Sequence, residues 1–261
     1  MKHCFSIKRF CLSALLLIGS VAAYAQPYKL IAHRGGIVDS LTPENSLPAL
    51  EKAIQKGYWM VEIDLRITAD SVLITQHDRN FKRYFGVDSA VTSMTWEQIQ
   101  KLRTPFGTRV LLFEEVLQAC QGKINVMIDN KIQGMDSALF YKVIALLDKY
   151  NLRENALMIG TDESTEFFTG KVRLSCTRKQ VEENKLRSDY NPSHYYLFSS
   201  DISSDDVKWA KKEKLMVVGV LNHRAPFSPE AREKMKRTAA SLLKAGVRNF
   251  QLDAAFEDLL K

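Results

Sequence analysis

No apolar run in this sequence reaches the length of about 20 residues that a membrane-spanning helix needs. The longest run lies at 12–23, after a basic N-terminal stretch and before the small-x-small triplet Ala-Tyr-Ala at 23–25. This pattern predicts a signal peptide over 1–25, export across the inner membrane to the periplasm, and a mature protein that starts at Gln26. No stable membrane insertion is expected after cleavage, although an uncleaved N-terminal anchor is the alternative.

Cysteine is scarce, which excludes a disulfide framework as the basis of the fold. The chain has four cysteines, and two of them fall in the predicted signal, so only Cys120 and Cys176 remain. Two buried free thiols and a single disulfide are both compatible with this pattern. Since 46% of the residues are hydrophobic, the chain can bury a full core, and we expect one domain over 26–261.

The sequence also lacks a cluster of basic residues, although its formal charge is +7. The predicted signal contains three basic and no acidic residues, so the mature chain has 34 Lys and Arg against 30 Asp and Glu, a net charge of +4. Because these charges are spread along the chain, they indicate a solvated surface and no nucleic-acid partner.

What the sequence does contain is a regular alternation of apolar, β-rich runs with helical segments. The clearest helix is 42–57, with Thr42 as N-cap, Pro43 in the first turn and Gly57 at its end. Two others are expected at 135–151 and 228–246. Nine runs are typical of strands, namely 28–33, 60–67, 71–77, 124–129, 156–161, 172–177, 195–200, 215–222 and 249–254.

The spacing of these strands predicts how they are connected. The gap between 60–67 and 71–77 is too short for the crossover that parallel neighbours need, so 71–77 is expected to fold back as an antiparallel hairpin strand. The other eight alternate with helices, and eight parallel strands close a (β/α)8 barrel. An open doubly wound sheet is the alternative, but no glycine-rich phosphate loop opens a helix here. We therefore expect an α/β fold, a (β/α)8 TIM barrel with one extra antiparallel strand.

Chemically active side chains follow the ends of four of these strands, and strand ends form the active-site mouth of such a barrel. Glu62 and Asp64 lie two apart on a strand with apolar flanks, so both are expected to point inward, which is costly unless they are paired or bind a metal. Each side chain alone would fit a structural role, but their convergence at one mouth favours a functional one. The set consists of His33, Arg34, Glu62, Asp64, His77, Asp78, Asp129 and Lys131.

This combination is typical of a site that acts on a phosphate ester. Three carboxylates offer the oxygen ligands that Ca²⁺ or Mg²⁺ prefers, whereas zinc prefers His and Cys. An Arg and a Lys beside a divalent cation bind phosphate oxygens, and two His can act as general base and general acid near neutral pH. The pair Gly35-Gly36 is expected to permit a turn and a close approach, and to keep the mouth open.

At these residues the sequence resembles the glycerophosphodiester phosphodiesterase family. The family's pattern is His-Arg-Gly, Pro-Glu-Asn-Thr, Glu-x-Asp, Thr-x-Asp-Gly, His-Asp and Glu-x-Lys, in that order. This chain departs from it at Ser46, where the family has Thr, at Ser71, where it has Gly, and at Asp129, where it has Glu. Later segments, 217–222 and 246–253, are less similar. The matching stretches are HRG (33–35), PENS (43–46), EID (62–64), TADS (68–71), HD (77–78) and DNK (129–131).

The resemblance implies that Ca²⁺ or Mg²⁺ supports hydrolysis of glycerophosphodiesters to sn-glycerol 3-phosphate and an alcohol. Either histidine can be the acid or the base. The shorter Asp129 is expected to shift the metal or to admit a water ligand. Asn222, at the end of a later strand, is expected to contact the substrate. The residues that the resemblance itself implies are His33 and His77 for catalysis, Glu62, Asp64 and Asp129 for the metal, Arg34 and Lys131 for phosphate, and Glu44 as a carboxylate that orders the site.

Two other functions remain open at this point. One is a phospholipase C- or D-like enzyme on membrane phospholipids, which would need an exposed apolar ridge beside the mouth. The aromatic residues Phe81, Tyr84, Phe85 and Trp96 can form such a ridge or line an alcohol pocket, but aromatics at this spacing more often pack a small separate core. The other is a binding protein on a barrel whose catalytic chemistry has decayed.

Overall fold

A computed structural model of the chain describes residues 28–223 and 228–260; the predicted signal peptide 1–25 and its cleavage point before Gln26 lie outside them. Eight parallel strands form a closed barrel, because β1 pairs with β12 on one side and with β2 on the other. All eight predicted barrel strands are confirmed, and the open-sheet alternative is wrong. The barrel strands are β1 (Lys29–Ala32), β2 (Met60–Ile67), β7 (Asn125–Asn130), β8 (Leu157–Ile159), β9 (Arg173–Cys176), β10 (Tyr195–Ser199), β11 (Met216–Leu221) and β12 (Asn249–Leu252).

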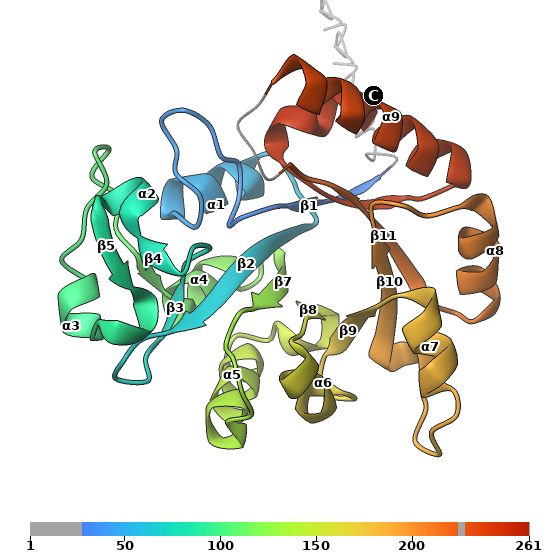
Figure 1. The fold of residues 1–261 in the computed structure, drawn as a ribbon, viewed down its shortest axis with the longest axis horizontal. Coiled ribbons are helices and arrows are strands. Elements are labelled where there is room, and N and C mark those ends of the chain that lie inside the picture. Colours follow the sequence, from blue (N-terminus) through green and yellow to red (C-terminus); the bar gives the residue numbers. More distant parts are fainter. Residues whose placement is uncertain (1–27, 224–227, 261) are drawn as a thin grey trace, which may run out of the picture.

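Helices surround this ring of strands on the outside (Figure 1). Inside, buried apolar side chains fill the barrel beneath its mouth, among them Met60, Met127 and Tyr196. Met60 and Met127 each precede an acidic residue of the same strand face by two positions, so the interior changes from apolar to charged towards the strand ends. The outer helices are α1 (Leu47–Gln55), α4 (Phe113–Cys120), α5 (Ser137–Lys149), α6 (Asp162–Phe168), α7 (Arg178–Asn184), α8 (Ser204–Lys212) and α9 (Pro229–Ala245).

The first helix begins later than the sequence predicts. Ser46, and not Thr42, is the N-cap of α1, and its hydroxyl accepts a hydrogen bond from the Ala49 amide at 3.4 Å. Thr42 instead pairs with Asp39 in a short antiparallel bridge. The helix cannot start earlier because Asn45 has a φ of 50°, a left-handed conformation outside the helical range. The other two predicted helices are confirmed as α5 and α9.

The predicted hairpin is also confirmed, since β3 (Leu73–Thr75) pairs antiparallel with β2. The segment that follows forms a small layer beside β2 and β3 (Figure 1) with its own core, in which the buried Phe81 contacts Phe85 and Trp96 packs against the cluster. For these three aromatics the separate-core interpretation is right, whereas Tyr84 lies at the site described below. The layer comprises β4 (Asn80–Phe81), α2 (Lys82–Phe85), β5 (Val87–Ala90), η1 (Val91–Ser93), α3 (Trp96–Ile99) and β6 (Leu111–Leu112).

The two cysteines that follow the predicted signal, Cys120 and Cys176, are both free and buried, so the disulfide alternative is wrong. Burial raises the pKa of the Cys120 thiol to about 12 and that of Cys176 to about 11, which makes both unreactive. Within 28–223 and 228–260, the helices are too short or too polar to cross a membrane.

Candidate active site

Three carboxylates meet at the mouth of the barrel. Glu62 and Asp64 come from β2 and Asp129 from β7, and the two strands pair in register with Asp64 beside Asp129. The nearest oxygens of the three side chains all lie within 4.8 Å of one another. The side chains of Glu62 and Asp64 are buried and that of Asp129 is 26% exposed. The two-residue spacing on each strand therefore brings the predicted carboxylates together, as expected.

The cluster of Glu62, Asp64 and Asp129 carries more negative charge than Lys131 can neutralise. Burial raises the pKa of Glu62, and the neighbouring charges of Asp64 and Asp129 raise it further. Burial also opposes ionisation of Asp64, but Lys131 and two nearby histidines lower its pKa overall. The Lys131 ammonium lies 2.5 Å from Asp129 Oδ2 and 3.2 Å from Asp64 Oδ1. A single lysine against three carboxylates leaves a site that attracts more positive charge.

Two oxygens of the cluster point to a metal ion. Among the described residues, Glu62 Oε1 and Asp64 Oδ1 are buried and accept no hydrogen bond, and of the two only Asp64 Oδ1 has an ion-pair partner, the Lys131 ammonium at 3.2 Å. Buried polar atoms without a partner are costly, and native structures retain few of them. An oxygen-only set of three carboxylates is the kind of site that Ca²⁺ or Mg²⁺ occupies. The residues present therefore fit the divalent cation that the sequence predicts, with Glu62, Asp64 and Asp129 as the side chains that would hold it.

His33 is held at one side of the cluster. It follows β1, and its Nδ1 lies 2.6 Å from Oδ1 of Asp253, which follows the neighbouring strand β12. The other imidazole nitrogen, Nε2, faces the cluster at 3.9 Å from Glu62 Oε2. Asp253 also accepts a hydrogen bond from the His223 amide at 2.8 Å, which fixes the carboxylate. Asp253 was not among the predicted site residues, although its position at the end of the last barrel strand was a usable signal.

His77 approaches the cluster from the extra antiparallel strand. It follows β3, and its Nδ1 lies 2.8 Å from Asp78 Oδ1. Arg66, on β2, donates from Nη2 to the His77 carbonyl at 2.7 Å and so fixes the backbone beneath the ring. Asp78 is itself fixed, because Arg83 Nε donates to its Oδ2 at 2.7 Å. Both histidines thus use Nδ1 to contact a carboxylate, which leaves Nε2 of each available for chemistry.

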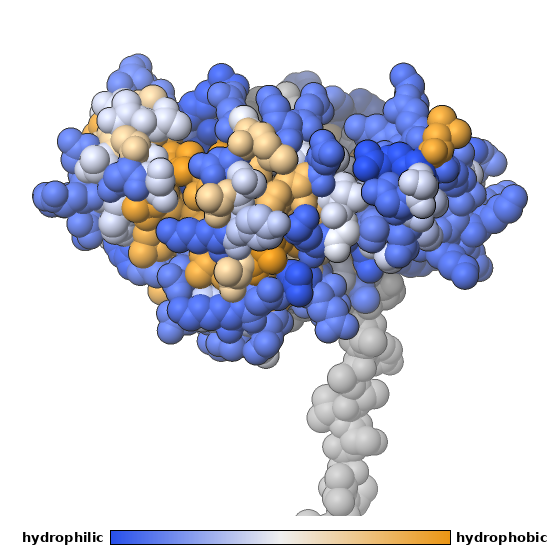
Figure 2. Space-filling model, turned by 90° about the horizontal axis from the view of Figure 1, so that it is seen from below, coloured by the Kyte–Doolittle hydropathy of each residue, from blue (hydrophilic) through white to orange (hydrophobic). Residues whose placement is uncertain are grey.

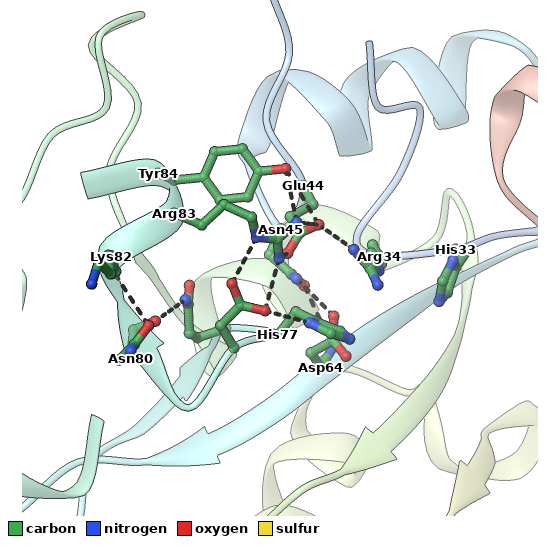
Figure 3. Close-up of polar contacts among 12 residues, drawn as sticks. His33, Arg34, Glu44, Asn45, Asp64, His77, Asn80, Lys82, Arg83 and Tyr84 are labelled. Carbon is green, nitrogen blue, oxygen red and sulfur yellow. Dashed lines mark hydrogen bonds and ion pairs between the residues drawn. The ribbon is translucent and has the colours of Figure 1, made fainter. Parts of the chain in front are cut away.

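Glu44 connects the two sides of the site. Figure 3 shows its carboxylate between Arg34 on one side and Arg83 and Tyr84 on the other. Arg34 Nη1 donates to it at 2.9 Å and Arg83 Nη1 at 3.1 Å, while the Tyr84 hydroxyl lies at 3.4 Å. Arg34 also donates its backbone N–H to Glu62 Oε2 at 2.6 Å. The sequence analysis left Arg83 without a role and assigned Tyr84 only to an aromatic ridge, pocket or core, because both lie on α2, a four-residue helix without a clear pattern.

The glycine pair does something different from what the sequence suggests. A Cβ on Gly36 would lie 2.1 Å from the Ala49 carbonyl oxygen, and one on Gly35 would lie 2.6 Å from Asn45 Cα. The close approach is therefore made by the backbone at the start of α1, and the glycines pack this backbone against β1 instead of keeping the mouth open. This packing lets Asn45 donate from Nδ2 to Asp64 Oδ2 at 2.8 Å.

Comparison with known proteins identifies this architecture. Residues 33–229 match the Glycerophosphoryl diester phosphodiesterase family. The chain belongs to this family. The match includes every residue of the acidic cluster and both histidines described above.

Individual family members show how far the likeness extends. Lysophospholipase D GDPD1 of Rattus norvegicus is 32% identical over 147 residues, which cover 51% of this chain and 45% of that protein. The chain thus spans less than half the length of this curated relative. A glycerophosphoryl diester phosphodiesterase structure from Parabacteroides distasonis has a TM-score of 0.69 at 21% identity, covering 91% of this chain and 90% of that one. A phosphodiesterase of Oleispira antarctica in complex with the product sn-glycerol-3-phosphate has a TM-score of 0.65 at 16% identity, covering 85% and 92%. At these identities the two structures show a shared fold.

Asn222 is the most peripheral of the site residues predicted for this family member. It follows β11 and donates from Nδ2 to Gln251 Oε1 at 3.1 Å. Its neighbour His223 donates its amide to Asp253, so Asn222 lies on the His33 side of the mouth. Direct contacts join His33 through Glu62 and Arg34 to Glu44, and Asp64 through Lys131 to Asp129. His77 is linked to Glu44 indirectly, through Asp78 and Arg83.

Proposed function

We propose that this family member is a metal-dependent phosphodiesterase that hydrolyses glycerophosphodiesters to sn-glycerol 3-phosphate and an alcohol. The observation that carries the proposal is the pairing of a buried three-carboxylate cluster with two histidines, each held at Nδ1 by an aspartate. The product bound in the Oleispira antarctica phosphodiesterase structure supports the choice of substrate. A divalent ion on Glu62, Asp64 and Asp129 would neutralise charge on the phosphate.

The protein's own side chains account for the proton transfers. With a proton on Nδ1 shared with Asp253, the neutral His33 has a basic Nε2 that faces the cluster. It would take the proton from the glycerol 2-hydroxyl as that oxygen attacks phosphorus. His77, protonated on both nitrogens, would give its Nε2 proton to the departing alcohol oxygen when the phosphorus–oxygen bond breaks. Lys131 would bind phosphate oxygens through its ammonium, and Arg34 would do so through its buried Nε.

Water completes the reaction. The first step leaves a cyclic phosphate on glycerol, with His33 protonated and His77 neutral. In the second step His77 would take a proton from water, whose oxygen attacks phosphorus, while His33 returns its proton to the glycerol oxygen. Both residues then regain their starting protonation states, so the cycle balances.

The direct test measures glycerol 3-phosphate release from glycerophosphocholine and glycerophosphoethanolamine by the purified protein, with Ca²⁺, Mg²⁺ or EDTA. Metal-dependent release that His77→Ala abolishes would support the proposal. His194→Ala is the matched control, because His194 precedes β10 at the opposite end of the barrel and should leave the rate unchanged. Absence of release with both metals would refute hydrolysis of these diesters and favour a lipid substrate or the decayed binding protein.

A lysophospholipid is the second candidate substrate. The rat relative is named a lysophospholipase D. In this chain, Leu41 and Leu47 are 69% and 41% exposed and flank the loop that carries Glu44. Figure 2 shows further hydrophobic residues gathered on one face, interrupted by hydrophilic ones. Cleavage of lysophosphatidylcholine, with no release from glycerophosphocholine in the same assay, would favour this candidate.

We also propose that residues 1–25 direct export and that the enzyme acts in the periplasm. Support comes from the basic stretch, apolar run and Ala-Tyr-Ala triplet of the sequence. Expression of the full chain in a Gram-negative host, followed by N-terminal sequencing of the periplasmic protein, tests it. A start at Gln26 would agree with the proposal, and uncleaved protein in the membrane fraction would contradict it.

A further inference from the structure

A cavity of about 240 Å³ lies beside the acidic cluster, between the barrel and the layer formed by β4 and β5. Lys131 belongs to its wall and also to the cluster, so the two spaces adjoin. Backbone from β5 and η1 closes one side, where the Val91 amide donates to the Arg79 carbonyl at 2.9 Å. The lining includes the basic residues Arg66, Arg79 and Lys131 and the apolar residues Ile67, Val91 and Ile132.

The charged side chains that line this cavity are all basic. It contains three basic residues and no acidic residue among the described lining. Arg66 uses Nε and Nη2 to hold the backbone carbonyls of Gln76 and His77, and its Nη1 makes no hydrogen bond within the described residues. Arg79 is exposed, and among residues 28–223 and 228–260 its guanidinium forms no ion pair with a carboxylate. Two guanidinium groups thus remain available to an anion.

The nearest carboxylates do not cancel this charge in the working enzyme. Asp64 and Asp129 both lie against Lys131, but they are two of the three side chains that would hold the divalent ion. When they bind that ion, their charge is directed to it. Asp78, the other carboxylate that acts on Arg66, is already paired with Arg83, so the wall stays positively charged. The cavity also lies on the His77 side of the mouth, because Arg66 fixes the His77 carbonyl. In the proposed reaction this is the side on which the alcohol departs.

We propose that this cavity is a subsite for the alcohol and that it selects diesters whose alcohol carries a second anionic group, such as a phosphate. The inference rests on the proposed function and adds a substrate class to it. Guanidinium groups bind phosphate through charge-assisted and often bidentate hydrogen bonds. A wall with three cations repels the quaternary ammonium of choline. A volume of about 240 Å³ suits a small phosphorylated polyol rather than an acyl chain.

Two substrates that differ only in that anionic group test the proposal. They are glycerophosphoglycerol and the same diester with a terminal phosphate on its alcohol, each assayed with saturating metal. The wild type should show a kcat/KM at least about tenfold higher for the phosphorylated diester, the effect of one charged hydrogen bond. Arg79→Gln should bring this ratio close to one. Arg103→Gln, in which only bonds to nearby carbonyls are lost, should leave the ratio unchanged.

A binding measurement separates failure of the subsite from failure of the proposed function. Titration calorimetry with sn-glycerol 3-phosphate at a saturating divalent ion, the state in which Asp64 and Asp129 hold the ion, should show a second site in the wild type besides the one at the cluster, and about tenfold weaker binding at that second site in Arg79→Gln. Equal hydrolysis of both diesters, with no effect of Arg79→Gln on the ratio, would overturn the subsite and leave the phosphodiesterase intact. Hydrolysis of neither diester would overturn the proposed function, and the subsite would then also be refuted if Arg79→Gln binds glycerol phosphate as tightly as wild type.

Discussion

Replacing Glu62 with Gln should stabilise the metal-free protein, although Glu62 lies at the centre of the candidate site. The Glu62 carboxylate is buried beside Asp64 and Asp129, and its Oε1 accepts no hydrogen bond among the described residues. Gln has the same shape without the charge, and its oxygen can still accept the Arg34 amide. Removing this buried charge from beside two other carboxylates should raise the free energy of unfolding by about 1–3 kcal/mol. For a chain of this size, that corresponds to about 2–4 °C in Tm per kcal/mol.

A divalent ion should reverse this order of stability. Binding to the native state alone stabilises the wild type by about 4.1 kcal/mol when the free ion is at about 1,000 times its Kd, which exceeds the expected advantage of the variant. Glu62→Gln removes one of the three carboxylates that would hold the ion, so its gain should be much smaller. The variant should therefore unfold at a higher temperature than wild type in EDTA and at a lower temperature in Ca²⁺ or Mg²⁺.

The difference in stability between Glu62→Gln and wild type in EDTA should depend on pH, and the direction of this dependence follows from the pKa of Glu62. Burial raises the pKa of Glu62 in the folded protein above its ordinary value of 4.5. Below that ordinary value both folded and unfolded states bind the proton, so Glu62 contributes no pH dependence. Between the ordinary and the raised pKa the folded state binds more protons, and its stability falls as pH rises. The advantage of Glu62→Gln in EDTA should therefore grow from about pH 4 towards neutral pH.

Thermal unfolding followed by circular dichroism, in EDTA and in saturating metal at several pH values, measures all three effects. Glu51→Gln, on the exposed face of α1, is the matched control for the loss of one carboxylate charge. If Glu62→Gln is less stable than wild type in EDTA, the charge of Glu62 does not destabilise the folded protein, and the reasoning is refuted. Equal metal-induced gains for variant and wild type would show that Glu62 does not hold the ion.

Three further predictions follow from the contacts. Asp253→Asn should lower kcat about a hundredfold with little change in KM, since His33 would lose the partner that sets its tautomer; a normal kcat would refute this positioning role. Gly36→Ala should lower the free energy of unfolding, measured in urea, by about 3 kcal/mol or more, because the added Cβ would lie 2.1 Å from a carbonyl oxygen. Gly57→Ala is the control and should lower it much less, because a Cβ there meets nothing within 4 Å. Because the two buried cysteines are free, reductant should leave Tm unchanged, and a lowered Tm would indicate a disulfide.

Sequence reasoning reached the barrel because its signals are local. Each apolar run is long enough to predict a strand, and the short gap before β3 permits only a hairpin. The residues of the cluster were found in the same way, since Glu62 and Asp64 share one strand face. The start of α1 was predicted wrongly because Thr42 and Pro43 form an acceptable local start signal. The left-handed Asn45, which contacts Asp64, rules that start out, and this contact is not local.

The sequence by itself determined which segments form strands, how many of them are parallel and which carboxylates lie two apart on β2, because periodicity and loop length depend on neighbouring residues only. The closure of the barrel depends on the pairing of its first strand with its last and was settled by the tertiary structure. The tertiary structure alone decided which partners surround these groups. Asp253 contacts His33 across 220 positions, because β12 closes the barrel against β1. Arg83 reaches Glu44 across 39 positions, because the small layer folds back over the mouth. Contacts of this kind depend on how distant segments pack, and no local pattern in the chain encodes them.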